Sequence, residues 1–359
     1  MMLTPMVDET HDVLGFIPTW IRKLAAGTDH LFVITLDSDK ETDLPENVSL
    51  FSLRVKNGRL KKLIYFYKLL TGHILREKIN IIFCHMYPLF TCLAGPVASI
   101  LRIPIVTWYT HRAVTFQLRL AHFFASRIVT ASKESFGINS SKVIITGHGI
   151  DINMFKPPEK FNDGHKKIIL SVGRISPVKN YETLIEAANI LTNGMGNKDL
   201  NFMVVGGMVN RESQAYHLKL KRLLETYQLE DKFTFVGPVS YKEMARCYQC
   251  CDVLVNLSPT GSFDKSVLEA MACGKPVLVC SESFIDFLGG KAEDFIFDER
   301  NPYSLSEKIL LIRDMKKDAR EQISVNYRRK IVEGHNINNL TIKLINIFEE
   351  LKEGNRRHV

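Results

Sequence analysis

The sequence predicts an α/β protein built from two doubly wound parallel sheets. Short apolar runs alternate with longer helical patterns along the chain, which is the pattern of βαβ units. At 359 residues the chain is longer than one hydrophobic core usually organises, so two domains are expected. A polar, proline-containing stretch at 155–165 interrupts the alternation and is the best candidate for the link between them.

The first half of the chain supplies the elements of one sheet. A very short first strand leads into a loop at 4–15. The further strands are expected at 31–36, 48–53, 80–84, 103–108, 128–131 and 143–145, and the helices at 18–26, 60–78 and 89–101.

The second half repeats the alternation. Its strands are expected at 167–172, 201–205, 233–236, 253–257 and 276–280, and its helices at 180–192, 214–227, 241–250, 267–273 and 302–315, with a final helix at 340–352. We therefore expect an N-terminal domain at 1–158, a second domain at 159–325, and a helical segment at 326–359 that returns to the N-terminal domain.

Composition favours a globular protein of a reducing compartment. Hydrophobic residues make up 45% of the chain and charged residues 24%, which is average for such proteins. The seven cysteines follow no disulfide-framework spacing, and the first twelve residues lack the pattern of an export signal. A cytoplasmic location is expected.

Positive charge is concentrated in one part of the chain. Residues 51–150 carry fourteen Lys or Arg and two Asp or Glu, whereas the net charge of the whole chain is +8. Within this block, residues 56–78 mix basic and apolar side chains, as do helices that lie peripherally on anionic membranes. The alternative is a solvated helix that packs its apolar face on its own sheet. Nucleic acid is a less favoured partner because no recognised binding motif accompanies the charge.

A first candidate binding segment runs from the end of a buried strand into a helix, at 171–180. Gly173 lets the backbone approach a ligand, and Arg174 and Lys179 flank a helix start whose free N–H groups favour an anion. Ligands of open α/β sheets bind at this edge. The segment predicts a diphosphate site, although a basic residue after a strand is, taken alone, more often a surface charge.

A second candidate segment, at 258–277, reads as a strand end, a loop with free amides, a helix with an early carboxylate, a glycine stop and another strand. The loop amides can hold hydroxyls or phosphate, and Glu269 can accept hydrogen bonds from two vicinal hydroxyls of a ribose. The alternative role of Glu269 is to stabilise its own helix dipole.

With Gly206-Gly207, Phe235-Val236-Gly237, Lys142-Val143-Ile144 and Gly149-Ile150-Asp151 leading to Phe155, these segments resemble family-four glycosyltransferases of the GT-B fold. The resemblance covers nearly the whole chain and is strongest from about 141 to 279. It implies two Rossmann-like domains facing each other across a cleft, a donor diphosphate bound by Arg174 and Lys179, a ribose bound by Glu269, and a base near Val236. The expected donor-binding set is Gly15, Gly173, Arg174, Lys179, Gly206, Val236, Ser262, Phe263, Asp264, Lys265 and Glu269.

The chain departs from the family pattern at Gly261. The family usually has two glutamates separated by seven residues, and the first would fall at this position, so a carboxylate often placed near the sugar is missing. The amides of Phe263, Asp264 and Lys265 remain available to hold the donor.

The first domain contributes weaker candidates. His111 follows a strand and matches a family histidine near the sugar, where it can make a polar contact or shuttle a proton; a structural histidine at a strand end is the alternative. His85 ends the preceding strand and is a candidate for the same cleft. Gly15 stands near the place of a family Gly-Gly pair that reaches the phosphate.

The sequence therefore predicts a hexosyltransferase that moves a sugar from a nucleotide-diphosphate sugar to a glycan or lipid-linked acceptor, in polysaccharide or glycolipid biosynthesis. The resemblance implies retention of anomeric configuration and neither metal nor other cofactor. His111, Arg174 and Lys179 are the catalytic candidates, the two cations because they would stabilise the departing diphosphate. One alternative is a catalytically inactive GT-B module that binds a nucleotide or a partner, which would account for Gly261. A nucleic-acid-binding protein is the less favoured one.

Overall fold

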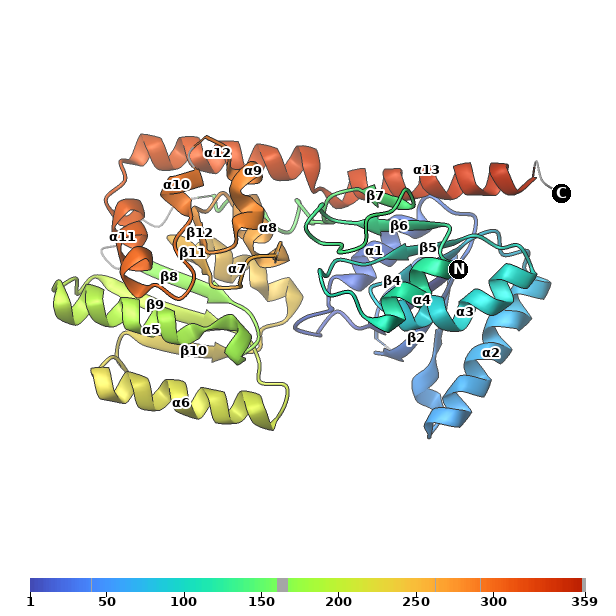
Figure 1. The fold of residues 1–359 in the computed structure, drawn as a ribbon, viewed down its shortest axis with the longest axis horizontal. Helices are drawn as coiled ribbons and strands as arrows, with labels where there is room; N and C mark the ends of the chain where they lie inside the picture. The colour runs from blue at the N-terminus through green and yellow to red at the C-terminus, as the bar shows by residue number, and fades with distance from the viewer. Residues whose placement is uncertain (40, 160–166, 262, 291, 357–359) are drawn as a thin grey trace. The chain divides into compact units, whose positions relative to one another are not determined.

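The structure is a computed structural model that describes residues 1–39, 41–159, 167–261, 263–290 and 292–356 (Figure 1). The chain divides into two compact units. The first is Met1–Gly149 together with Gly334–Val359, and the second is Ile150–Glu333. The boundaries expected from the sequence, after 158 and after 325, both fall inside the second unit.

The first unit is a parallel sheet flanked by helices. Within the described residues its sheet has seven strands in the order β3-β2-β1-β4-β5-β6-β7, all paired in parallel. The elements are β1 (Met2–Val7), α1 (Ile17–Ala25), β2 (Leu31–Ser38), β3 (Val48–Ser52), η1 (Leu53–Val55), α2 (Arg59–Arg76), β4 (Ile82–His85), α3 (Pro88–Ile100), β5 (Ile105–Trp108), α4 (Phe116–Phe124), β6 (Arg127–Thr130), β7 (Val143–Ile145) and α13 (Ile337–Arg356).

Burial explains these elements. Strands β4 and β5 are buried along their whole length, as parallel strands covered on both faces must be. Helix α2 buries Phe66, Leu70 and Ile74, which recur at the four-residue spacing of one helix face. Helix α13 closes the unit, because Phe348 contacts Phe83 of β4 with ring centroids 5.6 Å apart. The C-terminal segment thus shares the core of the first unit.

The second unit repeats the arrangement with a smaller sheet. Its described strands follow the order β10-β9-β8-β11-β12, again all parallel. The elements are β8 (Lys167–Val172), η2 (Pro177–Lys179), α5 (Tyr181–Asn189), η3 (Ile190–Gly194), β9 (Leu200–Val205), α6 (Arg211–Tyr227), β10 (Phe233–Gly237), α7 (Tyr241–Cys250), β11 (Val253–Asn256), α8 (Lys265–Ala272), β12 (Val277–Val279), η4 (Glu282–Phe284), α9 (Ile285–Leu288), α10 (Ala292–Phe295), α11 (Pro302–Arg313) and α12 (Lys317–Gly334).

Four described helices, α4, α9, α10 and α12, lie outside the elements that the sequence predicts. Helix α4 leaves Phe116 and Phe123 exposed, so its apolar residues do not mark a buried face. Helix α12 buries only Ser324, Tyr327 and Ile331 over its length, which is too sparse a stripe to recognise. The first strand also differs from expectation, because β1 continues to Val7 through residues expected in a loop.

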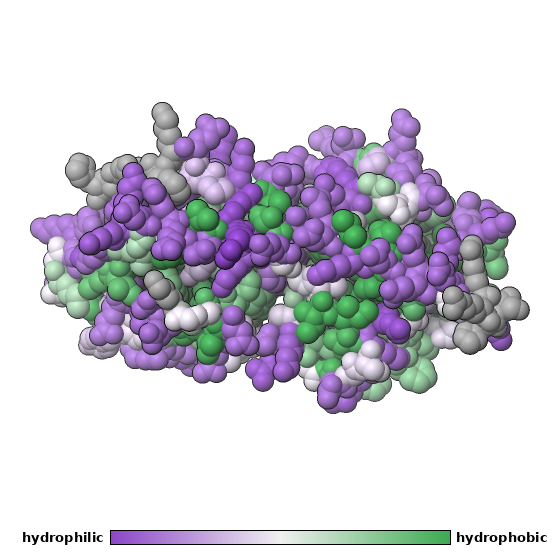
Figure 2. All heavy atoms as spheres, turned by 90° about the horizontal axis from the view of Figure 1, so that it is seen from above, coloured by the Kyte–Doolittle hydropathy of each residue, from purple (hydrophilic) through white to green (hydrophobic). Residues whose placement is uncertain are grey.

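The surface drawn in Figure 2 is mostly hydrophilic, with small hydrophobic areas between polar side chains. No helix within the described ranges has both the length and the apolar character needed to cross a bilayer.

Candidate functional site

The strand order of the second unit creates a binding edge. Strand β8 lies between β9 and β11, so the connections from β8 and β11 leave the sheet in opposite directions. At such a switch point the carboxyl ends of the strands border a crevice that binds ligands in open α/β sheets. The two candidate segments of the sequence start at this edge, since β8 ends at Val172 and β11 ends at Asn256.

Lys179 joins the two segments. Its Nζ donates hydrogen bonds to Ser258 Oγ at 2.6 Å and to Asp264 Oδ2 at 2.7 Å. The same carboxylate oxygen accepts from Ser258 Oγ at 2.5 Å and from Asn256 Nδ2 at 2.9 Å. The network fixes the ammonium at the switch point, next to the start of α5. It also supplies Lys179 with a counter-charge from within the site.

Glycines bring the strand ends close together. The φ angle of Gly206 is +157°, and a Cβ atom on it would lie 2.0 Å from the carbonyl oxygen of Gly173. Only glycine fits there. After Gly173 the chain reaches the surface at the exposed Arg174, and the following residue, Ile175, is buried. The exposed guanidinium of Arg174 has no hydrogen bond or ion pair with the described residues, so it is available to an anion.

Glu269 is more constrained than the sequence suggests. Its side chain is 6% exposed; Oε2 accepts a hydrogen bond from Tyr248 at 2.8 Å, and Oε1 lies 3.0 Å from Lys265 Nζ. Lys265 also donates to the hydroxyl of Tyr241 and lies over its ring. Burial lowers the pKa of Lys265, and the Glu269 carboxylate opposes this effect. A carboxylate offers more than two lone pairs, so ribose hydroxyls can still donate to Glu269, but they must share its oxygens with Tyr248 and Lys265.

Sequence reasoning missed the partners in this arrangement. Asn256 lies in a strand and gave no motif, while Tyr241 and Tyr248 lie on α7, which no binding pattern marked. Their roles depend on the packing of α7 against α8. No local sequence pattern indicates that α7 packs against α8.

The loop before α8 carries the remaining donor-site candidates. Gly261 has a φ angle of +95°, a conformation that side-chain-bearing residues rarely adopt, and its N–H donates to Ser283 Oγ at 3.2 Å. Phe263 is buried against Phe284, with ring centroids 4.5 Å apart. Val236 lies at the end of β10 and is exposed. Ser262 lies outside the described residues.

The first-unit candidates differ among themselves. His111 is exposed, and its Nδ1 accepts a hydrogen bond from the N–H of Ala113 at 3.0 Å. His85 is completely buried; its ring lies 4.7 Å from that of Trp20 and its Nδ1 lies 3.2 Å from Thr4 Oγ1. A substrate cannot reach such a side chain, so the expectation that His85 lines an open cleft is corrected. Gly15 is buried just before α1.

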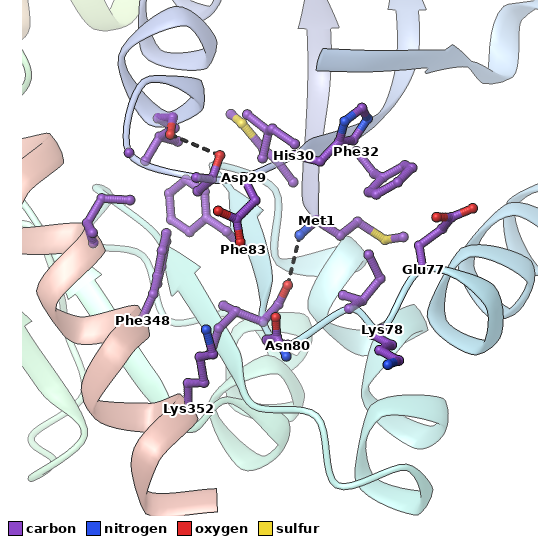
Figure 3. A pocket seen from close by; sticks show the side chains of 18 of the residues that line it. Met1, Asp29, His30, Phe32, Glu77, Lys78, Asn80, Phe83, Phe348 and Lys352 are labelled. Atoms are coloured by element: carbon purple, nitrogen blue, oxygen red, sulfur yellow. Dashed lines mark hydrogen bonds between the residues drawn. The ribbon is translucent and has the colours of Figure 1, made fainter. Parts of the chain in front are cut away.

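A cavity of about 370 Å³ in the first unit lies away from these residues (Figure 3). It opens at the amino-terminal edge of the sheet, where β1, β2 and β4 begin, and Phe83, Phe348 and Lys352 line it. It contains none of the sequence-predicted site residues.

Solved structures of the same fold cover nearly the whole chain. Sucrose-phosphate synthase from Thermosynechococcus elongatus matches with a TM-score of 0.76 at 17% identity, over 99% of this chain and 100% of that one. HepE from Anabaena, solved in complex with UDP-glucose, matches with a TM-score of 0.75 at 16% identity, over 98% and 100%. The predicted GT-B class of α/β fold, with two Rossmann-like units, is thereby confirmed.

Sequence similarity is concentrated in the second unit. Residues 154–330 match the family described as glycosyl transferases group 1. A D-inositol 3-phosphate glycosyltransferase from Paenarthrobacter aurescens is 29% identical over 156 residues, which are 40% of this chain and 36% of that protein. The chain thus spans about a third of the length of this curated relative. The residues that match the glycosyl transferases group 1 family include the switch-point cluster.

Proposed function

We propose that the protein is a glycosyltransferase that moves a hexose from a nucleotide-diphosphate sugar to a glycan or lipid-linked acceptor. The observation that carries this proposal is the position of Lys179. Its ammonium lies where β8 and β11 diverge, bonded to Ser258 and Asp264, within a segment of the glycosyl transferases group 1 family. The relative named as a glycosyltransferase and the fold neighbour solved with UDP-glucose support the same substrate class.

The residues of the second unit account for the chemistry. A diphosphate at the switch point would meet the free guanidinium of Arg174, the ammonium of Lys179 and the first amides of α5 and α8. When the bond between sugar and diphosphate breaks, negative charge grows on the leaving phosphate and positive charge on the sugar. Cations already fixed at the phosphate stabilise that transition state more than the ground state.

The proposal includes retention of configuration and no metal, both of which rest on the family resemblance. Arg174, Lys179 and helix amides would offset the charge of the diphosphate, against the opposing charge of Asp264, which pairs with Lys179. His111 is the proposed polar contact from the first unit, since its exposed ring is free to meet a substrate.

Calorimetric titration with a panel of UDP-sugars and GDP-sugars tests the donor site. Arg174→Ala should weaken binding of the preferred donor by roughly 1.5 to 3 kcal/mol, because it removes charge-assisted hydrogen bonds to phosphate. Arg211→Ala, a matched change of an exposed arginine on α6, should leave binding unchanged. Equal affinities in the two variants would contradict the assignment.

A nucleotide-binding module without transfer activity is the second candidate, and one missing side chain and two ion pairs favour it. The backbone of Gly261 offers no carboxylate, Asp264 holds Lys179, and Lys265 holds Glu269. Every charged donor-site residue except Arg174 is thus paired from within. Single-turnover assays on a donor that binds decide between the candidates: sugar transfer or slow hydrolysis supports the enzyme, and a bound donor that stays intact supports the module.

For the acceptor side, we propose an anionic membrane surface. Helix α2 packs Phe66, Leu70 and Ile74 inward, as the solvated-helix alternative expects. Its other face nevertheless leaves Leu60 70% and Ile64 61% exposed among lysines. Apolar bulk between exposed cations is the composition of peripheral membrane helices. A lipid-linked acceptor would fit such a surface.

A further inference from the structure

The motif at 149–155 contributes no side chain to the proposed donor site, although residues 150–155 lie in the same unit. Asp151 closes a turn within it. Its Oδ1 accepts from the N–H groups of Asn153 and Met154, at 3.0 and 3.2 Å. Its carbonyl oxygen accepts from the N–H of Phe155 at 2.8 Å. The turn thereby sets the direction in which the side chain of Phe155 enters the core.

Arg328 of α12 ties this turn to α8. Its Nη2 donates to the carbonyl oxygen of Ile152 at 2.8 Å. Its Nη1 donates to the carbonyl oxygen of Phe155 and, at 2.7 Å, to that of Ala272, the last residue of α8. Hydrogen bonds from a charged guanidinium are stronger than neutral ones and hold a defined geometry. The turn that carries Phe155 is therefore fixed relative to the helix that carries Glu269.

The ring of Phe155 packs against two tyrosines of α7. Its centroid lies 5.4 Å from that of Tyr241 and 5.8 Å from that of Tyr248, in both cases at an interplanar angle of 67°. Edge-on contacts at these distances are favourable and depend on ring orientation as well as separation. Phe155 and Tyr248 are completely buried and Tyr241 is 5% exposed, so none of the rings can turn without displacing close-packed neighbours.

The hydroxyls of the same two tyrosines meet the charged pair of the proposed donor site. Tyr248 donates to Glu269 Oε2 at 2.8 Å, and Tyr241 accepts from Lys265 Nζ at 3.0 Å. Burial and the negative charge of Glu269 raise the pKa of Tyr248 well above its usual value, so the hydroxyl keeps the proton that it donates. Each tyrosine thus has its ring on Phe155 and its hydroxyl on the charged pair.

We infer that Phe155 is a positioning residue of the donor site, which orients the Glu269 carboxylate through the two tyrosines of α7. The side chain of Phe155 has no hydrogen-bonding group, so its effect on Glu269 passes through their rings. Two vicinal ribose hydroxyls need a carboxylate whose oxygens are held in place. The inference rests on the proposed function, and in particular on the ribose role of Glu269.

Replacing Phe155 by leucine separates positioning from packing. The smaller side chain keeps the position apolar but leaves space beside the tyrosine rings, so the rings and their hydroxyls gain freedom. The Glu269 carboxylate then loses its fixed hydrogen bond from Tyr248, and with it part of the ribose contribution to binding. A residue that only fills the core would lower stability and leave the ribose contribution as it was.

Calorimetric titration of the full chain with two probes tests the inference. The probes are the nucleotide-sugar that binds most tightly in the panel of UDP-sugars and GDP-sugars, and its 2′,3′-dideoxy analogue. The dissociation constant of the analogue divided by that of the intact donor measures the ribose contribution. Phe155→Leu should lower this ratio about fivefold, since a hydrogen bond to a charged group is worth about tenfold or more in affinity. The affinity for the analogue should hardly change.

Phe295→Leu is the matched control. Phe295 is also buried, and its ring meets that of a tyrosine, Tyr327, at 5.8 Å and 67°. The hydroxyl of Tyr327, however, has no hydrogen-bond partner among the described residues. The substitution removes the same volume from the same unit and should leave the ratio as it is in the unchanged chain.

A double substitution tests the route through the tyrosines. Tyr248→Phe removes the hydroxyl that bonds Glu269 and keeps the ring that Phe155 contacts. Because part of the effect of Phe155 passes through this hydroxyl, Phe155→Leu should lower the ratio less in the Tyr248→Phe background than in the unchanged chain.

Three results would overturn the inference while leaving the donor site in place: a ratio unchanged by Phe155→Leu, an equal fall in Phe295→Leu, or the same fall with and without the Tyr248 hydroxyl. If Phe155→Leu does not fold, Phe155→Met, which keeps more of the volume, carries the test. Equal binding of both probes by the unchanged chain would overturn the ribose role of Glu269, and the inference with it. Failure to bind any nucleotide-sugar would overturn the proposed function itself.

Discussion

At the scale of single residues, the proposed donor site is defined by internal charge pairing. The sequence predicts that Lys179 and Glu269 bind the donor. In the structure Lys179 forms an ion pair with Asp264, and Glu269 forms one with Lys265. Both partners come from the short stretch before and within the first turn of α8. A donor must therefore compete with these side chains, and its affinity depends on how strongly each pair is held.

Removing the internal counter-charge of Lys179 should tighten donor binding. In Asp264→Asn the amide oxygen can still accept from Lys179, but the negative charge that repels a diphosphate is gone. A partly exposed ion pair is worth up to about 1 kcal/mol, so an increase in affinity of about fivefold is expected. Calorimetry against the matched surface change Glu282→Gln measures it. Unchanged binding would contradict the prediction, and weaker binding would show that Asp264 helps to hold the donor.

The ribose role of Glu269 has its own signature. Glu269→Gln should weaken the intact donor more than its 2′,3′-dideoxy analogue, because only the former has hydroxyls to donate to the carboxylate. The substitution also disturbs Lys265 and Tyr248, which would affect both ligands alike. The difference between the two losses isolates the ribose contribution, and equal losses would leave Glu269 a structural role alone.

At the scale of elements, α2 has two apolar faces of different kinds. Phe66, Leu70 and Ile74 serve the core of the first unit, whereas Leu60 and Ile64 remain outside with the lysines. The buried face explains why the helix forms. The exposed face is the part of α2 that we propose contacts an anionic membrane.

Charge reversal on α2 tests this contact. Each Lys near an anionic bilayer is worth about 1 kcal/mol, so Lys61→Glu with Lys62→Glu should reduce vesicle binding more than tenfold. Co-sedimentation with phosphatidylglycerol vesicles measures this, with phosphatidylcholine vesicles and high salt as conditions that abolish it. Lys221→Glu with Arg222→Glu on α6 makes the same charge change elsewhere and should bind as before. Equal vesicle binding by both double variants would show that residues 56–78 form a solvated helix face.

At the scale of the whole molecule, the chain passes from one unit to the other at 149–150 and again at 333–334. Both crossings are tied together inside the first unit. Gly147, at φ +84°, lies so close to Gly334 that a Cβ atom would approach its carbonyl oxygen to 2.1 Å. The N–H of His148 donates to Nδ1 of the buried His335 at 3.0 Å.

The burial of His335 in this contact predicts that the stability of the first unit depends on pH. Burial, with a smaller effect of Lys343, lowers the pKa of His335 to about 4 from the usual 6.5. Between those values the unfolded chain binds more protons than the folded one, so stability falls as pH drops from 6.5 toward 4, by up to roughly 3 kcal/mol. His335→Asn keeps an acceptor but cannot titrate, and should flatten this dependence.

Urea unfolding at pH 7 and pH 4.5, followed by tryptophan fluorescence, measures the effect. Both tryptophans of the chain, Trp20 and Trp108, lie in the first unit, so the signal reports on the unit that contains His335. His30→Asn, on an exposed histidine, serves as the control. A variant at His335 with the same pH dependence as the unchanged chain would contradict the prediction.

The sequence by itself determined the class of fold and the two segments of the donor site. Parallel strands are buried on both faces, so their apolar runs stand out, and glycines such as Gly173 and Gly206 are required by backbone approach that no other residue allows. Elements that bury few apolar residues, such as α12, left no such mark.

Only the tertiary structure decided which charges meet. Lys179 and Asp264 are far apart in the chain, and Glu269 meets Tyr248 through the packing of two helices. The tertiary structure also places His85 in the core of the first unit, where it is completely buried. Local patterns record which backbone a segment adopts, whereas the pairing and burial of polar groups depend on neighbours that the fold brings in from elsewhere in the chain.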